Sequence, residues 1–368
     1  MKKQIILFVL MLLPMMANAF AGVAVVDGIK YFIVTNYQTA EVRANSYTGD
    51  IVIPETIEYD GVTCHVTSIG NGAFSGCSSL TTVSIPSSVT SIGDWAFGGC
   101  SSLTSITIPE NVTSINYCIF YGCSGLTSVS IPSSVTSIEE WAFYDCSSLT
   151  SVVIPESVTS IFNNAFENCL NLTTINLPEG LDSISSSTFS NCKSLTSITI
   201  PSSVTRINHA AFDGCSSLTS VKVNIETPLP IDCNPFPNRA NVTLYVPAGS
   251  KALYEAAEYW SQFSNIVEMP KCATPTITYV NGKVRFACET EDVEYVPTMT
   301  CELKHPLNGN EMEIGGTFTI SVYATKDGYS NSDVATITIT MGKMGDLDGD
   351  GQLSVTDVTS LVNAILGK

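Results

Sequence analysis

The sequence is poor in basic residues. Its 368 residues include 16 lysines and arginines against 34 aspartates and glutamates, which gives a formal net charge of −18. A nucleic-acid partner requires clustered lysine and arginine side chains that neutralise phosphates. The sequence has no such cluster, so we expect a protein that binds neither DNA nor RNA.

Histidine is also scarce. The three histidines, His65, His209 and His305, lie in three different regions, and none is part of a catalytic motif. Catalysis requires titratable groups that converge on one point, and glycoside hydrolysis requires a pair of facing carboxylates. The repeated segments offer no such pair, and we interpret Glu139 and Glu140 as a solvated acidic edge. We therefore predict no enzymatic activity.

Long apolar runs are confined to the start of the chain. Two lysines precede an apolar run over residues 5–16, and Ala17-Asn18-Ala19 follows it. This layout is typical of a cleavable secretory signal, and an apolar run of about 12 residues is too short to cross a bilayer. We predict a signal peptide over residues 1–19, cleaved before Phe20. The protein would be exported to the extracellular space or cell surface, with no transmembrane segment in the mature chain.

Thirteen cysteines would ordinarily indicate disulfides in an exported protein. Seven of them, however, recur every 23 residues: Cys77, Cys100, Cys123, Cys146, Cys169, Cys192 and Cys215. Neighbouring members of such a column would lie within bridging distance, but their side chains would point in parallel and one would be left over. We favour buried free thiols and keep disulfides as the alternative. No histidine or carboxylate column accompanies the sulfurs to suggest a metal site.

A phenylalanine and a leucine column share this period. The clearest copy of the repeat, residues 87–109, reads SSVTSIGDWAFGGCSSLTSITIP. The phenylalanines are Phe74, Phe97, Phe120, Phe143, Phe166, Phe189 and Phe212. The leucines are Leu80, Leu103, Leu126, Leu149, Leu172, Leu195 and Leu218.

A fixed period of this length marks a solenoid, in which only stacking of the repeats completes a core. The L-x-x-I-x-I-P stretch alternates like a strand, and proline ends it because it lacks a backbone donor. We predict a mainly β protein with short helices and turns, built around about seven coils of 23 residues. At about 4.8 Å per coil the repeats would span roughly 35 Å.

The pattern V-x-x-I-x-x-x-A-F-x-x-C-x-x-L-x-x-I-x-I-P, over residues 62–224, resembles the BspA-like leucine-rich repeat family of bacterial surface proteins. GIKYFIV and IVIPETI, within residues 20–61, resemble an N-terminal cap. The segment from TPLPIDCNPFP to YEAAEYWSQFSNIVE, within residues 225–270, resembles a terminal coil with its helix. The resemblance implies adhesion, meaning binding of host extracellular proteins, other cells or surface glycans, without catalysis.

Columns that vary between coils are free to make specific contacts. Trp95, Tyr117 and Trp141 precede the phenylalanine column, and Tyr121 and Tyr144 follow it. Aromatic side chains grouped on one edge suit recognition of a protein or a sugar face, so these five residues are the candidate ligand-binding site. The alternative is that they pack on one another between coils.

The 23-residue period stops before residue 271. Short alternating runs such as TITYV, KVRFAC, FTISVYAT and ATITIT follow, separated by Asn-Gly, Gly-Gly and Asp-Gly turns. This pattern predicts a small Ig-like β-sandwich over residues 271–341. It resembles the C-terminal sandwich of chitobiase-type and many Bacteroidetes surface proteins, in which that domain is a spacer. Cys288 and Cys301 are candidates for a bridge across its strands.

The C-terminal segment has the spacing of a calcium loop. Oxygen ligands recur at loop positions 1, 3, 5, 7, 9 and 12, and Gly351 permits the sharp turn at position six. The predicted Ca²⁺ ligands are Asp346, Asp348, Asp350, Gln352 through its backbone carbonyl, Ser354 and Asp357. Apolar residues at helical spacing follow the loop.

Residues 344–368 therefore resemble one dockerin repeat. Family dockerins pair two such repeats, and the partner cohesin reads the positions held here by Val355 and Thr356. Only one repeat is present, so besides a cohesin-like or other surface protein as partner, self-docking, surface retention and pairing with another half-repeat are equally open.

Two functions follow. The first is a secreted or surface adhesin-like protein that recognises a host extracellular protein, a cell surface or a glycan through the solenoid. The alternative is a non-catalytic scaffold subunit of a calcium-dependent, dockerin/cohesin-type assembly linked to polysaccharide use.

Overall fold

The computed structural model describes residues 21–231, 234–236, 238–280, 283–304, 307–308, 311–312, 315–326 and 328–341. The signal peptide predicted for residues 1–19 and the calcium loop-helix predicted for residues 344–368 lie outside these residues. The chain divides into two units, Met1–Leu244 with Ala256–Asn265 and Tyr245–Glu255 with Ile266–Lys368.

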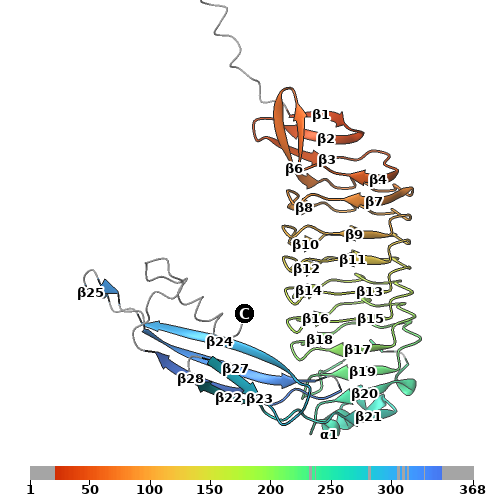
Figure 1. Cartoon of the computed structure of the whole chain (residues 1–368). Helices are drawn as coiled ribbons and strands as arrows, with labels where there is room; N and C mark the ends of the chain where they lie inside the picture. The colour runs from red at the N-terminus through yellow and green to blue at the C-terminus, as the bar shows by residue number, and fades with distance from the viewer. Residues whose placement is uncertain are drawn as a thin grey trace, which may run out of the picture. The chain divides into compact units, whose positions relative to one another are not determined.

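The first unit begins with a mixed sheet that continues into the repeats (Figure 1). Its strands are β1 (Ala21–Val26), β2 (Ile29–Val34), β3 (Thr39–Val42), β5 (Thr56–Tyr59) and β6 (Val62–Ile69). Their order in the sheet is β1-β2-β3-β6-β5, and β6 also pairs in parallel with the first short repeat strand. The last strand of the cap, β6, therefore pairs with the first short repeat strand in the same parallel manner as the repeat strands pair with one another.

One side of the stack is made by the strands of the L-x-x-I motif. β4 (Gly49–Val52) starts this series and pairs in parallel with β7. The others are β7 (Leu80–Ser84), β9 (Ser105–Thr107), β11 (Ser128–Ser130), β13 (Ser151–Val152), β15 (Thr174–Ile175), β17 (Ser197–Ile200) and β19 (Ser220–Val223). Their leucines and most of their branched residues point inward, and the serines and threonines between point outward, as the alternating pattern predicts.

A second side consists of strands that the sequence pattern did not lead us to expect. Each is a Ser-Ile or Arg-Ile pair: β8 (Ser91–Ile92), β10 (Ser114–Ile115), β12 (Ser137–Ile138), β14 (Ser160–Ile161), β16 (Ser183–Ile184) and β18 (Arg206–Ile207). They pair in parallel with the same residue one repeat away, as Ser137 does with Ser114. Two residues are too few to display an alternating pattern, which is why these strands escape a periodicity analysis.

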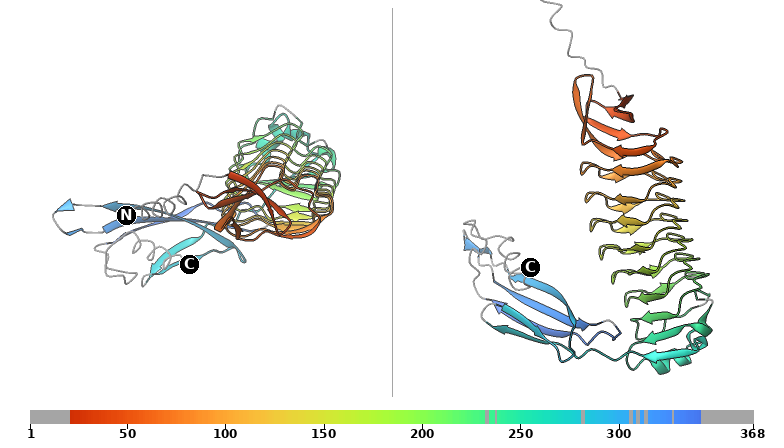
Figure 2. Two further views of the ribbon diagram at one scale, coloured as in Figure 1. Left: turned by 90° about the horizontal axis from the view of Figure 1, so that it is seen from above. Right: turned by 45° about the vertical axis from the view of Figure 1, so that its right-hand side comes forward.

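The third side is a column of turns that holds the phenylalanines. Each phenylalanine N–H donates to the carbonyl of the residue before the next phenylalanine, as Phe97 does to Ile119 O at 2.9 Å. The rings are fully buried and stack along the unit with centroid separations from 4.8 to 5.7 Å. Viewed down the axis, the coils lie over one another (Figure 2). Every coil therefore presents the same three ladders to its neighbours.

The stack is longer than the seven coils that the phenylalanine column counts. It has about ten turns at roughly 23-residue spacing. Tyr47 adds a ring at one end, 4.7 Å from that of Phe74, and Phe236 adds one at the other, 4.8 Å from that of Phe212. The cap segments therefore complete the core that a terminal repeat would otherwise expose.

The chain after the repeats forms short elements. They are η1 (Arg239–Asn241), β20 (Thr243–Val246), α1 (Lys251–Ala256), η2 (Trp260–Gln262) and β21 (Asn265–Glu268). The Thr243 N–H donates to Thr219 O at 2.9 Å, which extends the strand ladder by one step. Trp260 is buried, and its indole N–H donates to Leu229 O at 2.8 Å.

The cysteine column consists of buried free thiols. In the six members from Cys100 to Cys215, the Sγ donates to the carbonyl oxygen of the phenylalanine 26 residues earlier, at 3.0 to 3.3 Å. The thiols therefore point along the stack toward backbone oxygens and not toward one another. Burial raises the pKa of Cys215 to about 12 and holds those of Cys169 and Cys192 well above their usual range.

The second unit is antiparallel. A hairpin pairs β22 (Thr276–Val280) with β23 (Lys283–Ala287), and a sheet has the order β24-β27-β28. The remaining strands are β24 (Glu294–Lys304), β25 (Leu307–Asn308), β26 (Glu311–Met312), β27 (Gly315–Thr325) and β28 (Ala335–Met341). The chitobiase-type sandwich stays a prediction.

The structure does not form the disulfide suggested between Cys288 and Cys301, because Cys288 is a free thiol. Its Sγ donates to Ala273 O at 3.0 Å, so it is turned toward the chain just before β22. The side chain of Cys301 lies outside the described residues.

Candidate binding surface

The five aromatic residues singled out from the sequence, Trp95, Tyr117, Tyr121, Trp141 and Tyr144, come together as one surface, which we call the aromatic edge. They belong to three consecutive coils. The Tyr121 ring is central: its centroid lies 4.8 Å from that of Tyr144, 5.0 Å from that of Trp95 and 6.3 Å from that of Trp141. Tyr117 meets Trp95 edge-on at 6.3 Å, and Trp141 lies 5.0 Å from Tyr144.

The rings are packed on one another and exposed at the same time. Trp95 and Tyr117 keep 39% and 41% of their surfaces in contact with solvent, and the other three are half-buried. Packing of the rings on one another and exposure to a ligand are therefore compatible. Mutual packing restricts the rings, so a ligand would meet a platform that loses little conformational entropy on binding.

The tryptophans occupy backbone positions that do not favour them. Trp95 and Trp141 have φ of +58° and +62°, in the left-handed region. The turn geometry requires this region in every coil, and Gly72 and Asn164, which tolerate it better, hold the same column elsewhere. A bulky side chain in such a conformation costs on the order of 1–3 kcal/mol, and such residues cluster at functional sites. Cys118, Ser187 and Ala210 adopt the same conformation in other coils, so the turn itself does not require an aromatic residue.

Gly98 makes room for the Trp95 ring. A Cβ at this position would lie 2.8 Å from Trp95 Cε3, which is closer than such atoms approach. The following coils have Tyr121 and Tyr144 at the equivalent position. The absence of a side chain at Gly98 therefore lets the indole approach the backbone of its own turn.

Carboxylates surround the aromatic edge. The hydrogen bond with Cys118 raises the pKa of Tyr117 most, and electrostatic repulsion from Glu140 and Asp94 adds a smaller effect. Burial raises the pKa of Tyr144 first, and the negative charges of Glu167 and Asp145 add to it.

These carboxylates have no basic counterpart nearby in the sequence. No lysine or arginine stands between Arg43 and Lys193, a span that contains the whole aromatic edge. Their hydrogen bonds come from neutral groups, as when Asn163 Nδ2 donates to Glu140 Oε1 at 3.0 Å. The surface therefore combines aromatic rings with negative charges that no basic side chain neutralises. Sequence reasoning overlooked this combination, although the gap in basic residues could have indicated it.

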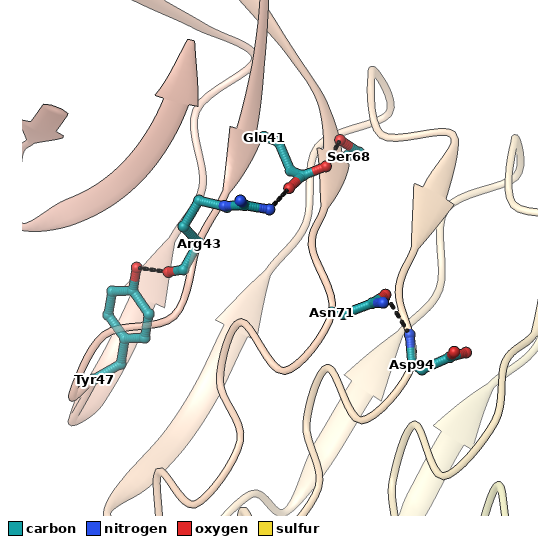
Figure 3. Close-up of polar contacts among 6 residues, drawn as sticks. All are labelled: Glu41, Arg43, Tyr47, Ser68, Asn71 and Asp94. Atoms are coloured by element: carbon teal, nitrogen blue, oxygen red, sulfur yellow. Dashed lines mark hydrogen bonds and ion pairs between the residues drawn. The ribbon is translucent and has the colours of Figure 1, made fainter. Parts of the chain in front are cut away.

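A polar hollow of about 270 Å³ lies where the cap meets the first coils, and Figure 3 shows part of its lining. Arg43 forms an ion pair with Glu41, and Ser68 Oγ donates to the same carboxylate at 3.4 Å. Asn71 Oδ1 accepts from the Asp94 N–H at 3.0 Å. These groups largely satisfy one another, so the hollow serves to join the cap to the repeats.

A larger hollow of about 580 Å³ lies at the other end of the first unit. Pro228, Pro230, Ile231 and Trp260 line it, together with the charged Arg206. It is predominantly apolar and is formed by the cap segment packed against the last coils.

The described residues contain no group of three or more histidine, cysteine or acidic side chains placed to hold a metal ion. His65 on β6 and His209 beyond β18 lie at opposite ends of the repeats, and His305 is outside the described part. The predicted Ca²⁺ ligands Asp346 to Asp357 also lie outside it. Within the residues that the structure describes, no helix is long and apolar enough to span a membrane.

The repeat matches a family model described as the BspA type leucine-rich repeat region, in six copies over residues 61–150 and 113–243. The chain belongs to the BspA-type leucine-rich repeat family. This confirms the resemblance drawn from the repeat pattern. No curated protein matches the chain.

Solved structures of bacterial leucine-rich repeat proteins are similar to this BspA-type chain. One, from Bacteroides ovatus, is 26% identical with a TM-score of 0.50, over 67% of this chain and 76% of its own. Another, from T. pallidum, is 30% identical with a TM-score of 0.46, over 52% of this chain and 87% of its own. A leucine rich cell surface protein from Faecalibacterium prausnitzii is 22% identical with a TM-score of 0.33, over 67% of this chain and 94% of its own.

Proposed function

We propose that this BspA-type protein is an exported, adhesin-like binding protein that holds an extracellular protein, a cell surface or a glycan on its aromatic edge. The observation that carries the proposal is the gathering of five partly exposed aromatic side chains on consecutive coils. Tryptophan and tyrosine dominate binding hot spots because they bury a large area at a low cost in conformational entropy.

The backbone strengthens the proposal. Ala210 and Ser187 hold the position of Trp95 and Trp141 in other coils, so the fold does not need an indole there. Because small residues hold this position at the same left-handed φ, the exposed indole of Trp95 and the half-buried one of Trp141 are best explained if their rings make contacts that stability alone does not demand.

The test uses the full chain with Trp95→Asn and Trp141→Asn combined. Asparagine suits the left-handed region and is the residue at Asn164 in the same column, so the coil should keep its fold. The matched control is Tyr37→Asn, which removes an aromatic ring that is 76% exposed in the turn between β2 and β3.

Both variants are compared with the unchanged protein on an array of extracellular-matrix proteins and polysaccharides, with and without Ca²⁺. We expect the double variant to lose at least about tenfold in affinity for any ligand found, and Tyr37→Asn to lose less than about twofold. Full binding by the double variant, with unchanged circular dichroism, would exclude the aromatic edge as the site.

A second function rests on the C-terminal sequence. The oxygen ligands at Asp346, Asp348, Asp350 and Asp357 have the spacing of a Ca²⁺ loop, which supports a scaffold subunit in a calcium-dependent assembly with a cohesin-like or other surface protein. Calorimetric titration of the full chain should detect one Ca²⁺ site that Asp346→Asn with Asp350→Asn abolishes. Undiminished Ca²⁺ binding by that variant would remove the basis of this second function.

Export can be tested separately. Antibody against the repeats should label intact cells or the culture supernatant. Labelling that requires lysis of the cells would contradict the predicted signal peptide.

A further inference from the structure

We infer that the ligand of the aromatic edge is a cationic protein segment, whose arginine or lysine side chains lie over the exposed rings and pair with the carboxylates around them. This inference rests on the proposed function and narrows it to one class of partner. Charge, ring exposure and the absence of an internal cation together lead to it.

The charge distribution is one-sided. Between Arg43 and Lys193 every charged side chain is acidic at neutral pH, so the coils that carry the aromatic edge produce an unbroken negative field. Such a field raises the association rate of a cationic partner and repels an anionic one. A sulfated polysaccharide would therefore be disfavoured on this surface.

Two carboxylates are direct chain neighbours of the rings. Asp94 directly precedes Trp95, and Glu140 directly precedes Trp141, so each indole of the aromatic edge has an acidic neighbour in its own turn. Both carboxylates also act electrostatically on Tyr117 between them. A guanidinium or ammonium group over these rings could thus meet a ring face and a carboxylate at once.

Cation–π contacts occur elsewhere in the first unit, where the chain supplies an arginine. At one end of the first unit the Arg239 guanidinium lies 4.2 Å from the Tyr259 ring centroid, and at the other Arg43 lies 5.3 Å from that of Phe32. The aromatic edge has more exposed ring surface than either pair, but the coils around it contain no basic residue. A partner has to supply the cation.

The experiment measures binding of a labelled oligo-arginine peptide to the full chain by fluorescence anisotropy. A neutral β-glucan oligosaccharide is tested as competitor. Two charge variants are compared: Asp94→Asn with Glu140→Gln at the aromatic edge, and Glu110→Gln with Glu156→Gln as the control. The control removes the same number of charges from exposed residues that follow the prolines at another corner of the coil.

We expect Trp95→Asn with Trp141→Asn to weaken peptide binding by about tenfold or more. The aromatic-edge charge variant should weaken it by about three- to tenfold and the control by less than about twofold. Binding of the unchanged protein should also fall several-fold between about 50 and about 300 mM NaCl, because surface charge interactions are screened.

Two results would overturn the inference. One is equal loss in both charge variants, which would mean a non-specific response to net charge. The other is competition by the neutral oligosaccharide, which would identify a glycan site on the same rings. If the tryptophan variant loses its array ligand while the unchanged protein does not bind the peptide, only the cationic inference fails. If the tryptophan variant keeps its array ligand, the proposed function fails as well.

Discussion

The phenylalanine column should carry much of the stability of the solenoid, and Phe143→Ala tests this directly. Phe143 lies in the middle of the repeats, is fully buried, and stacks on Phe120 at 5.3 Å and on Phe166 at 5.1 Å. Its loss would leave a cavity between two coils that identical backbone ladders hold at a fixed spacing. The neighbouring rings therefore cannot close the gap without breaking hydrogen bonds.

The expected cost follows from these contacts. Removing a fully buried phenylalanine side chain costs about 3–5 kcal/mol, because apolar burial is lost and a cavity remains. The lost ring pairs account for about 0.5–1.5 kcal/mol each within that total. We expect the upper half of the range, since the site is flanked by a ring on both sides. With a urea dependence of about 2–3 kcal/mol/M, a loss of about 4–5 kcal/mol should lower the midpoint of unfolding by about 1.3–2.5 M.

The assay is urea unfolding followed by tryptophan fluorescence. All three tryptophans, Trp95, Trp141 and Trp260, belong to the first unit, so the signal reports its unfolding and not that of the second unit. Val153→Ala is the control, because Val153 is 74% exposed on the strand side and should change stability by less than about 0.5 kcal/mol. A Phe143→Ala midpoint indistinguishable from that of the control would refute the view that the ring stack stabilises the coils.

Two further predictions concern single features. Gly98→Ala should displace the Trp95 ring, change the near-ultraviolet circular dichroism and weaken ligand binding, while costing less than about 1 kcal/mol because Trp95 is partly exposed; an unchanged spectrum would contradict the contact. The raised pKa of Cys215, about 12 against an ordinary 9.0, means that its thiol ionises in the unfolded chain first. The contribution of this thiol to stability should therefore be constant below about pH 9 and fall by about 1.4 kcal/mol per pH unit between about pH 9 and 12. The slope of stability against pH should be smaller in Cys215→Ala, and equal slopes would exclude the linkage.

The repeat architecture could be predicted from the sequence because stacked coils require the same residue type at the same position of every repeat. A residue in one coil is paired with the residue one period later, as Ser105 is with Ser128, so each column must keep one size and polarity. The inward phenylalanine, cysteine and leucine columns were read correctly for this reason. The sequence pattern does not predict the two-residue strands, because each needs only one buried isoleucine. It also predicts too few coils, because the rings at the two ends of the stack, Tyr47 and Phe236, fall outside the 23-residue spacing.

The candidate site was predictable only as a set of residues. Its members could be named because they vary within otherwise uniform columns, but the sequence did not decide between packing and exposure. In the structure the rings are both packed and exposed: Tyr121 contacts Tyr144 and Trp95, and Trp95 remains 39% exposed. The left-handed backbone of the tryptophans and the space above Gly98 have no sequence signal, because glycine, serine and alanine occupy the same turn elsewhere.

By itself the sequence determined the period, the inward-facing columns and the negative charge of the coils, because these depend on residue type at a fixed interval. Tertiary structure decided what the side chains do within that frame. The thiols remain free because parallel rungs direct each sulfur at a carbonyl oxygen, as Cys146 is directed at Phe120 O. The aromatic rings form one surface because adjacent coils place them within contact distance, and a distance between coils is a property of the stack and not of any one repeat.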